Sequence, residues 1–324
     1  MVLAHSPEDL KMCPPPLAPV AVQAMVLAAG RSERFAPGHK ALPLPEGGGL
    51  LARSLGNLSL AGLKTLVVVG HRAPEVTAEA TAYGASTIFN SNYDLGMFSS
   101  VLTGLVEISL RSPRDCVLVL PVDAAFVRGA SYIKLISFWL DLGEERKQVA
   151  VIPEYQGKLG HPPLLGPGPV RRVINYSESD GLKGALASFA GNITEANEIK
   201  EGYRPFDGPM GCSKLRYISI EDSFLLCDID QKEDLEVALS KKSPKPSKLT
   251  LREAITLLRL VGPPRKMAHA VTVATIALRL AIALGASEPE LAFVGGLLHD
   301  LDHGPNRHDL RAASRLWDLG FDEL

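Results

Sequence analysis

The residues with the clearest chemical potential lie early in the chain, in the segment AMVLAAGRSERFAPGHK at positions 24–40. An apolar run ends there at a glycine, and the run is followed by three cations and a hydroxyl: Arg31, Ser32, Arg34 and Lys40. Backbone N–H groups in a glycine-containing loop can cradle phosphate, and arginine and lysine can neutralise it. Because the sequence contains no GxxxxGK[ST] motif, the segment predicts a nucleoside triphosphate that is bound without a P-loop.

Carboxylates follow two further apolar runs. The segment VLVLPVDAAFV at 117–127 places Asp123 just past an expected strand, and LLCDIDQKEDLE at 225–236 repeats the pattern with Asp228 and Asp230. Carboxylate oxygens in such positions suit Mg²⁺ that bridges phosphates. Each acid taken alone is better explained as a turn or capping residue, and Asp230 with Glu233 loosely fits a capping box. Two acidic strand ends in one sheet, beside a cationic loop, are what metal-assisted nucleotidyl transfer requires.

Two other polar segments have weaker signals. NSNYDLGMFSSVLTGL at 90–105 places small polar residues before a helix, where Ser99 and Ser100 could cap the helix or face a ligand at its N-terminus. Capping is the better explanation of Ser99. GKLGHPPLL at 157–165 contains His161, and a lone histidine in a loop is more often a surface or packing residue than a catalyst.

A second group of metal-ligating side chains lies near the end of the sequence. The apolar segment 265–285 carries His269 near its start, and LLHDLDHGPNRH at 297–308 follows about one helical hairpin later. The second segment offers five ligand types: His299, Asp300, Asp302, His303 and His308. A buried histidine beside an aspartate is often a hydrogen-bonded core pair. A core pair does not account for five potential ligands and for a sixth, His269, that lies one helix away. Together they predict a divalent metal site.

Alternating strands and helices must position the first group. Short apolar, often β-branched runs predict strands at 26–29, 65–69, 86–89, 116–120 and 149–152, and amphipathic patterns between them predict helices at 50–60, 74–83, 99–110 and 130–141. This alternation indicates an α/β fold, a Rossmann-like and mostly parallel sheet with helices on both faces. Ligands in such sheets bind at the carboxyl ends of strands, where the first motif lies.

The second group belongs to a different region. LSKKSPKPSKL at 239–249 is rich in lysine, proline and serine and predicts a linker. Beyond it the pattern is helical, over 251–261, 267–284, 288–299 and 309–319. We therefore expect a leader at 1–20, a nucleotide-handling domain at 21–239, a linker at 240–249 and an all-α domain at 250–324.

Composition excludes several classes of protein. The 324 residues are 46% hydrophobic and 22% charged, which is typical of a globular protein with an ample core. A formal net charge of −2 gives no electrostatic reason to expect nucleic-acid binding, and no apolar run reaches the length of a membrane span. The four cysteines have no CxxC spacing, and the first 20 residues lack the pattern of a secretion signal. We expect reduced thiols and a cytoplasmic protein.

The segments, taken in order, resemble the MobA-like nucleotidyltransferases, and within them the molybdenum cofactor cytidylyltransferase branch. The resemblance covers roughly 21–239. It rests on LAAGRSERF with Lys40, VVVGH at 67–71, the 90–105 segment, LPVDAAFV, GHPPLL and DIDQKEDL.

The resemblance implies a mechanism and a site. Arg34 and Lys40 would hold the triphosphate, and Asp123 with Asp230 would hold Mg²⁺. The reaction would join CMP from CTP to the terminal phosphate of molybdopterin and release pyrophosphate. Ala29, where guanylyl-transferring relatives usually carry a second glycine, favours CTP over GTP. The resemblance also makes a molybdoenzyme apoprotein a candidate partner. The remaining nucleotide contacts implied are Leu27, Ala28, Ala29, Gly30, Arg31, Ser32, Gly70 and Ser99.

The sequence also departs from the family pattern. Phe35 and Ala36 replace the usual Met-Gly, two alanines replace the Met-Pro or Gln-Pro expected after Asp123, and 177–216 matches the acceptor side poorly. Two alternatives therefore stay open. One is transfer to a sugar phosphate or another phosphorylated small molecule, and the other is a cofactor-maturation chaperone that binds without turnover.

The helical region resembles the HD phosphohydrolase superfamily. His269, His299 and Asp300 match three positions that bind divalent metal in that superfamily. The later aspartate normally lies several helices downstream, and Asp309, Asp318 and Asp322 come early for that role. The domain is therefore short, and it is either an inactive or regulatory appendage or a metal phosphohydrolase.

Overall fold

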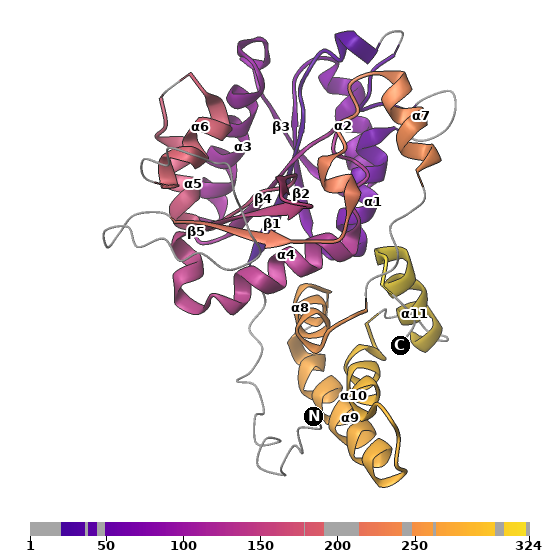
Figure 1. Ribbon diagram of the computed structural model, residues 1–324. Helices are drawn as coiled ribbons and strands as arrows, with labels where there is room; N and C mark the ends of the chain where they lie inside the picture. The colour runs from indigo at the N-terminus through magenta and orange to yellow at the C-terminus, as the bar shows by residue number, and fades with distance from the viewer. Residues whose placement is uncertain are drawn as a thin grey trace. The chain divides into compact units, whose positions relative to one another are not determined.

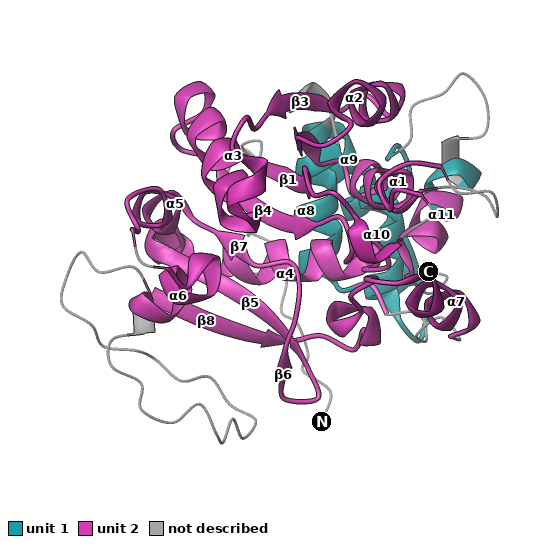
Figure 2. Ribbon diagram, turned by 90° about the horizontal axis from the view of Figure 1, so that it is seen from above, with its two compact units in different colours: residues 1–20, 250–313, 324 teal, residues 21–249, 314–323 magenta. Residues whose placement is uncertain are grey.

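The computed structural model describes residues 21–35, 38–43, 49–177, 179–190, 214–241, 248–261, 264–301 and 308–321. The chain forms two compact units (Figure 2). The larger covers Ala21–Leu249 together with Ser314–Glu323, and the smaller includes Thr250–Ala313. The larger unit also takes in the residues from Ser314, which the sequence predicts to lie in the all-α domain. The domain boundaries expected from the sequence therefore stay a prediction.

The larger unit is an α/β structure, as the sequence predicts (Figure 1). All five expected strands are present, together with three more, of which β6 and β7 have two residues each. The strands are β1 Val22–Ala28, β2 Lys64–Val69, β3 Ser86–Phe89, β4 Cys116–Pro121, β5 Val149–Tyr155, β6 Lys158–Leu159, β7 Leu164–Leu165 and β8 Lys214–Ser219. The helices of this unit are α1 Leu50–Leu60, α2 Ala73–Ala82, α3 Met97–Arg111, α4 Gly129–Asp141, α5 Pro167–Ile174, α6 Gly181–Ala187 and α7 Lys232–Ser240.

The strands form one mixed sheet in the order β3-β2-β1-β4-β7-β5-β6, with β8 paired to β5. The first four strands of this order are parallel, with Val26 of β1 opposite Val67 of β2 and Leu120 of β4. Strand β7 is antiparallel to both of its neighbours, and β8 is parallel to β5. The carboxyl ends of β1, β2, β3 and β4 therefore lie along one edge of the sheet.

Helices cover both faces of the sheet. On one face α3, α5 and α6 pack around a core of Met25, Leu66, Val119 and similar side chains. On the other, α1 packs on β1 and β2 and also contacts α4. Gly104 lets α3 approach closely, since a Cβ there would collide with the Met25 and Val68 side chains. Strands buried on both faces explain why the sequence shows continuous apolar runs.

One expectation for this unit is wrong. Residues 225–236 were expected to form a strand with acids at its end, but Ser223–Leu226 is a 3₁₀ turn and Cys227–Asp230 is irregular. The strand that pairs with β5 is β8, which lies upstream. Asp230 therefore reaches the sheet edge on a loop. Cys116 and Cys227 are free and buried, as expected, whereas Cys13 and Cys212 lie outside the described residues.

The smaller unit is helical, with α8 Leu251–Val261, α9 Pro264–Ala283 and α10 Pro289–Leu298. Helix α10 packs against both α8 and α9. Helix α11, His308–Leu319, crosses the boundary between the units, and its Arg315 donates to the Leu60 carbonyl within the larger unit (2.9 Å). Among the described helices, none combines the length and apolar composition that a membrane crossing requires.

Candidate active site

The loops at the carboxyl ends of β1, β3 and β4 enclose a cavity of about 560 Å³. Its walls include every member of the first motif that the sequence singled out, together with residues from the 3₁₀ turn before α3. The lining residues are Leu27, Ala28, Ala29, Gly30, Arg31, Ser32, Glu33, Arg34, His39, Lys40, Tyr93, Asp94, Gly96, Met97, Ser100, Pro121, Val122, Asp123 and Asp230.

Residues Gly30–Ser32, which we call the phosphate loop, have unused hydrogen-bond donors. Within the described part of the chain, the N–H groups of Gly30, Arg31 and Ser32 make no hydrogen bond. Ser32 adopts a left-handed conformation (φ 56°), which bends the backbone directly before a 3₁₀ turn at Glu33–Phe35. Consecutive free N–H groups in a bent segment form a concave site for an anion.

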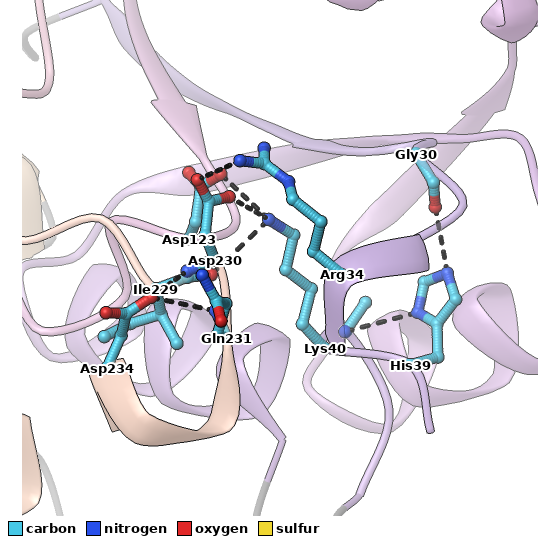
Figure 3. Close-up of polar contacts among 10 residues, drawn as sticks. Gly30, Arg34, His39, Lys40, Asp123, Ile229, Asp230, Gln231 and Asp234 are labelled. Atoms are coloured by element: carbon cyan, nitrogen blue, oxygen red, sulfur yellow. Dashed lines mark hydrogen bonds and ion pairs between the residues drawn. The ribbon is translucent and has the colours of Figure 1, made fainter. Parts of the chain in front are cut away.

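Lys40, which lines the cavity, lies between two carboxylates (Figure 3). Its Nζ is 3.0 Å from Asp123 Oδ2 and 3.5 Å from Asp230 Oδ1, and Arg34 contacts the other oxygen of Asp230 at 2.9 Å. Lys40 and Asp123 are mostly buried, with side chains 15% and 14% exposed, whereas Arg34 is 72% exposed. The carboxylate oxygens of Asp123 and Asp230 converge on one ammonium, so they form a set of oxygen ligands that fits a cation.

Asp123 is not a helix cap. Helix α4 begins at Gly129, and its first turn is served by a different acid, the fully buried Asp222, which accepts from the Arg128 N–H and the Ser131 hydroxyl. The Asp123 carboxylate instead faces Lys40, and its backbone carbonyl accepts from the Ile229 N–H at 3.2 Å. That backbone bond places the Asp230 loop directly against the end of β4.

Asp230 does not cap α7 either. The N-cap is Gln231, and Asp234 completes the capping box, because its Oδ2 accepts from the N–H groups of both Asp230 (3.0 Å) and Gln231 (2.8 Å). The capping box considered for Asp230 with Glu233 is therefore wrong by one residue. The Asp230 side chain remains available for Arg34 and Lys40.

Asp228 is a third acid near this pair. Partial burial raises the pKa of Asp228, and the Asp123 and Asp230 carboxylates raise it further, whereas His161 and Lys40 oppose the shift. His161 is thus close enough to influence the acidic cluster electrostatically. Asp228 follows an apolar run in the sequence, but the metal role was expected for Asp230 and not for Asp228.

On the opposite wall of the cavity lie Asp94 and Tyr93, which were not singled out from the sequence. Asp94 holds Arg31 through two hydrogen bonds, Nε to Oδ1 at 2.8 Å and Nη2 to Oδ2 at 3.0 Å. The Arg31 guanidinium also lies 5.8 Å from the centre of the Tyr93 ring. The hydrogen bond from Arg31 lowers the pKa of Asp94, so the pair is ionised near neutral pH.

Ser99 and Gly70 lie outside the cavity lining. Ser99 is not the N-cap of α3, which is Gly96; its hydroxyl donates to the Asn92 and Gly96 carbonyls at 2.8 Å and accepts from Asn90. Ser100 lines the cavity in its place. A Cβ at Gly70 would lie 2.7 Å from Tyr93 side-chain atoms, so the glycine permits close packing beside the site.

The second predicted cluster also assembles, within the smaller unit. One ligand atom each from His269, His299 and Asp300 lie within 4.8 Å of one another. Asp300 Oδ2 is 3.5 Å from His299 Nε2 and 3.9 Å from His269 Nε2. His299 Nδ1 lies 2.7 Å from the Gly296 carbonyl, which only a protonated Nδ1 can satisfy, so Nε2 is left as the ligand atom. Asp302, His303 and the side chain of His308 lie outside the described residues.

Family models match both parts of the chain. The family model of the MobA-like NTP transferase domain matches residues 24–193, more than half of the chain, and that of the HD domain matches residues 267–322. The fold and the match define a nucleotidyltransferase. The chain belongs to the MobA-like NTP transferase family.

Solved structures share the fold of the larger unit. The nucleotidyl transferase Mth528 from Methanothermobacter is 19% identical with a TM-score of 0.51, and the match covers 67% of this chain and 96% of that one. Rv0371c from Mycobacterium tuberculosis H37Rv is 19% identical with a TM-score of 0.50 over 69% and 100% of the two chains. Its homolog from Mycobacterium sp. strain JC1 is 21% identical with a TM-score of 0.50 over 68% and 96%. No curated protein matches the chain in sequence.

Proposed function

We propose that the chain transfers CMP from CTP to the terminal phosphate of molybdopterin and releases pyrophosphate, in the cytoplasm. The observation that carries the proposal is the Lys40 ammonium between Asp123 and Asp230, beside the free N–H groups of the phosphate loop. A cation site next to an anion site, at the carboxyl ends of parallel strands, is what a metal-bound triphosphate requires.

The protein groups have separate roles. Arg34, Lys40 and the N–H groups of the phosphate loop bind the triphosphate and stabilise charge on the leaving pyrophosphate. Asp123 and Asp230 are the residues that would hold Mg²⁺, which supplies positive charge to the phosphate oxygens when bound. Oxygen ligands alone make magnesium the expected cation.

The reaction needs little from side chains beyond position and charge. An oxygen of the acceptor phosphate forms a bond to the α-phosphorus, and the bond from that phosphorus to the bridging oxygen breaks, so pyrophosphate leaves with the electron pair. No general base is assigned, because a phosphate nucleophile is already an anion at neutral pH. Ala29, buried at the cavity wall, supports CTP as the first donor to test.

A second acceptor class has a specific observation behind it. Ala124 and Ala125, at the position where the family usually carries Met-Pro or Gln-Pro, are buried beside Asp123. A sugar phosphate or another phosphorylated small molecule is therefore the alternative acceptor.

Pyrophosphate release tests the proposal. CTP, GTP, ATP and UTP are each supplied with Mg²⁺ and with molybdopterin or a sugar phosphate, and the expected result is release with CTP and molybdopterin only. Release with a sugar phosphate alone selects the second acceptor. Absence of turnover with every pair overturns transfer and leaves the chaperone that binds without turnover.

A matched pair of variants ties any activity to the site. Asp123→Asn should reduce turnover by at least about 10²-fold while the melting curve stays that of the wild type. Asp115→Asn is the control, because Asp115 lies at the opposite end of β4 and accepts from Gln23 (2.6 Å). Equal turnover of Asp123→Asn and wild type would contradict the assignment.

We also propose that His269, His299 and Asp300 bind a divalent metal. Their convergence within 4.8 Å carries this proposal. Elemental analysis of the full chain should find metal that is lost in Asp300→Asn and kept in Glu290→Gln, a control on α10. Equal metal content in both variants would reject the site.

A further inference from the structure

His39 is a buried histidine whose ring joins the phosphate loop to the turn that carries Lys40. Its Nε2 lies 3.0 Å from the Gly30 carbonyl oxygen, and its Nδ1 accepts from the Ala41 N–H at 3.3 Å (Figure 3). A carbonyl only accepts and a backbone N–H only donates, so both bonds require a neutral ring with its proton on Nε2. The residue is 4% exposed, which shields both bonds from water.

A second histidine completes the attachment of this loop. His71, in the loop after β2, stacks on His39 with ring centres 5.9 Å apart and planes 22° apart. The His71 backbone N–H donates to the Ala29 carbonyl at 3.0 Å. The carbonyls of Ala29 and Gly30 thus accept hydrogen bonds from the His71 N–H and the His39 ring. The N–H groups of Gly30–Ser32 stay free within the described part of the chain.

We infer that His39 is a positioning residue: its neutral ring, protonated on Nε2, fixes the Gly30 carbonyl and so holds the phosphate loop in the conformation that binds phosphate. That the loop binds the phosphates of a nucleotide rests on the proposed function. The role of His39 does not depend on which nucleotide base or which acceptor the protein uses. His39 acts through Gly30 and needs no contact with the reacting atoms.

The charges around the ring favour its neutral form. Burial lowers the pKa of His39 most, and His71, Arg72 and Lys40 lower it further, whereas the bond to the Gly30 carbonyl raises it. The nearest acid on α2, Glu75, is paired with Arg72 at 3.0 Å. Because the folded-state pKa lies below the unfolded value of about 6.5, the ring stays neutral near pH 7 and protonates only as the pH falls through the lowered value.

Two substitutions separate the two bonds of the ring. His39→Gln places an amide N–H near the Nε2 position and can still donate to Gly30. His39→Asn places its amide at the level of Nδ1, where it can accept from Ala41 but cannot reach Gly30. We expect His39→Asn to weaken nucleotide binding, measured as KM, by about three- to tenfold with little change in kcat. His39→Gln should stay within about twofold of wild type.

The pH profile adds a readout that a merely structural role would not move. In the wild type KM should rise as the pH falls through the lowered pKa of His39, and in His39→Gln that rise should disappear. His71→Asn is a matched control, since His71 holds the loop through its backbone and should cost less affinity than His39→Asn. Equal KM for His39→Asn and wild type, or an unchanged acid limb in His39→Gln, would overturn the inference.

Two measurements need no turnover. Long-range ¹H–¹⁵N NMR of the wild-type chain should find the His39 proton on Nε2, with titration below that of an exposed histidine; a proton on Nδ1 or an ordinary titration would overturn the inference. Calorimetry with Mg²⁺ and inorganic pyrophosphate should rank wild type and His39→Gln above His39→Asn. If transfer fails while this ranking holds, the proposed function is wrong and the role of His39 stands.

Discussion

At the end of β4, Asp123 and Asp230 share the Lys40 ammonium, whereas the cluster in the smaller unit consists of two imidazoles and one carboxylate, His269, His299 and Asp300. Carboxylate oxygens suit magnesium, and imidazole nitrogens suit transition metals. The first site is already neutralised by the protein's own cation, so a metal must compete with Lys40 and is helped by the charge of a triphosphate. The second site would offer two neutral imidazoles and one carboxylate. If both sites hold metal as proposed, we expect binding to be coupled to substrate in the larger unit and independent of it in the smaller.

The largest expected effect comes from removing the shared cation. Lys40→Met leaves Asp123 and Asp230 without the ammonium between them and removes a charge that stabilises the leaving pyrophosphate. Turnover should fall by about 10³-fold in the pyrophosphate assay, with metal in the smaller unit unchanged. Lys64→Met, an exposed position at the start of β2, is the control. A comparable loss of turnover there would mean that the overall charge of the protein sets the rate, and not the position of Lys40 between the two acids.

A loss in the second site should leave the first untouched. His299→Ala removes one proposed ligand together with its hydrogen bond to the Gly296 carbonyl, and the affinity for added Zn²⁺ or Mn²⁺ should fall by at least about 10-fold. Transfer should proceed at the wild-type rate. A parallel fall in transfer would contradict the independence of the two sites.

A smaller effect separates the roles of two acids in one loop. Asp234→Ala loses the bonds from the Asp230 and Gln231 N–H groups, and it should lower the free energy of unfolding by about 1 kcal/mol. Asp230→Asn should instead abolish transfer with little change in stability. Urea melts and turnover measured on both variants check this; the reverse assignment would restore capping as the role of Asp230.

The smallest effect concerns the opposite wall of the cavity. Asp94→Asn weakens the bidentate hold on Arg31 and makes the guanidinium available to phosphate. Because the pair is largely exposed, KM for the nucleotide should fall by only about two- to threefold. A rise in KM would mean that Asp94 itself contacts the nucleotide.

Much of the larger unit was predictable from local patterns, because its central strands β1 and β4 are buried along almost their whole length and read as apolar runs. Ser86–Phe89, an edge strand, and the helix Leu50–Leu60 were expected with the bounds observed, since each is a short apolar or amphipathic run between turn residues. The strand Lys214–Ser219 was not, because its alternating charged and apolar residues follow a region without a clear pattern. The error at 225–236 has the same origin: an apolar pair before an acid is typical of a strand end and equally of a turn packed against one.

The sequence by itself determined the chemical inventory of this protein: a cationic glycine loop, acids after apolar runs, and histidines with an aspartate in a helical region. Those follow from residue type and local period, which the chain carries without folding. Only the tertiary structure decided the partners. It joined Asp230 to Asp123 through Lys40, made Gln231 and Asp234 the capping box of α7, and brought His39 and His71 against the phosphate loop. These contacts link residues far apart in the chain, such as Lys40 and Asp123 at a separation of 83 positions, and no local pattern specifies which distant side chain completes a charge pair or a hydrogen bond.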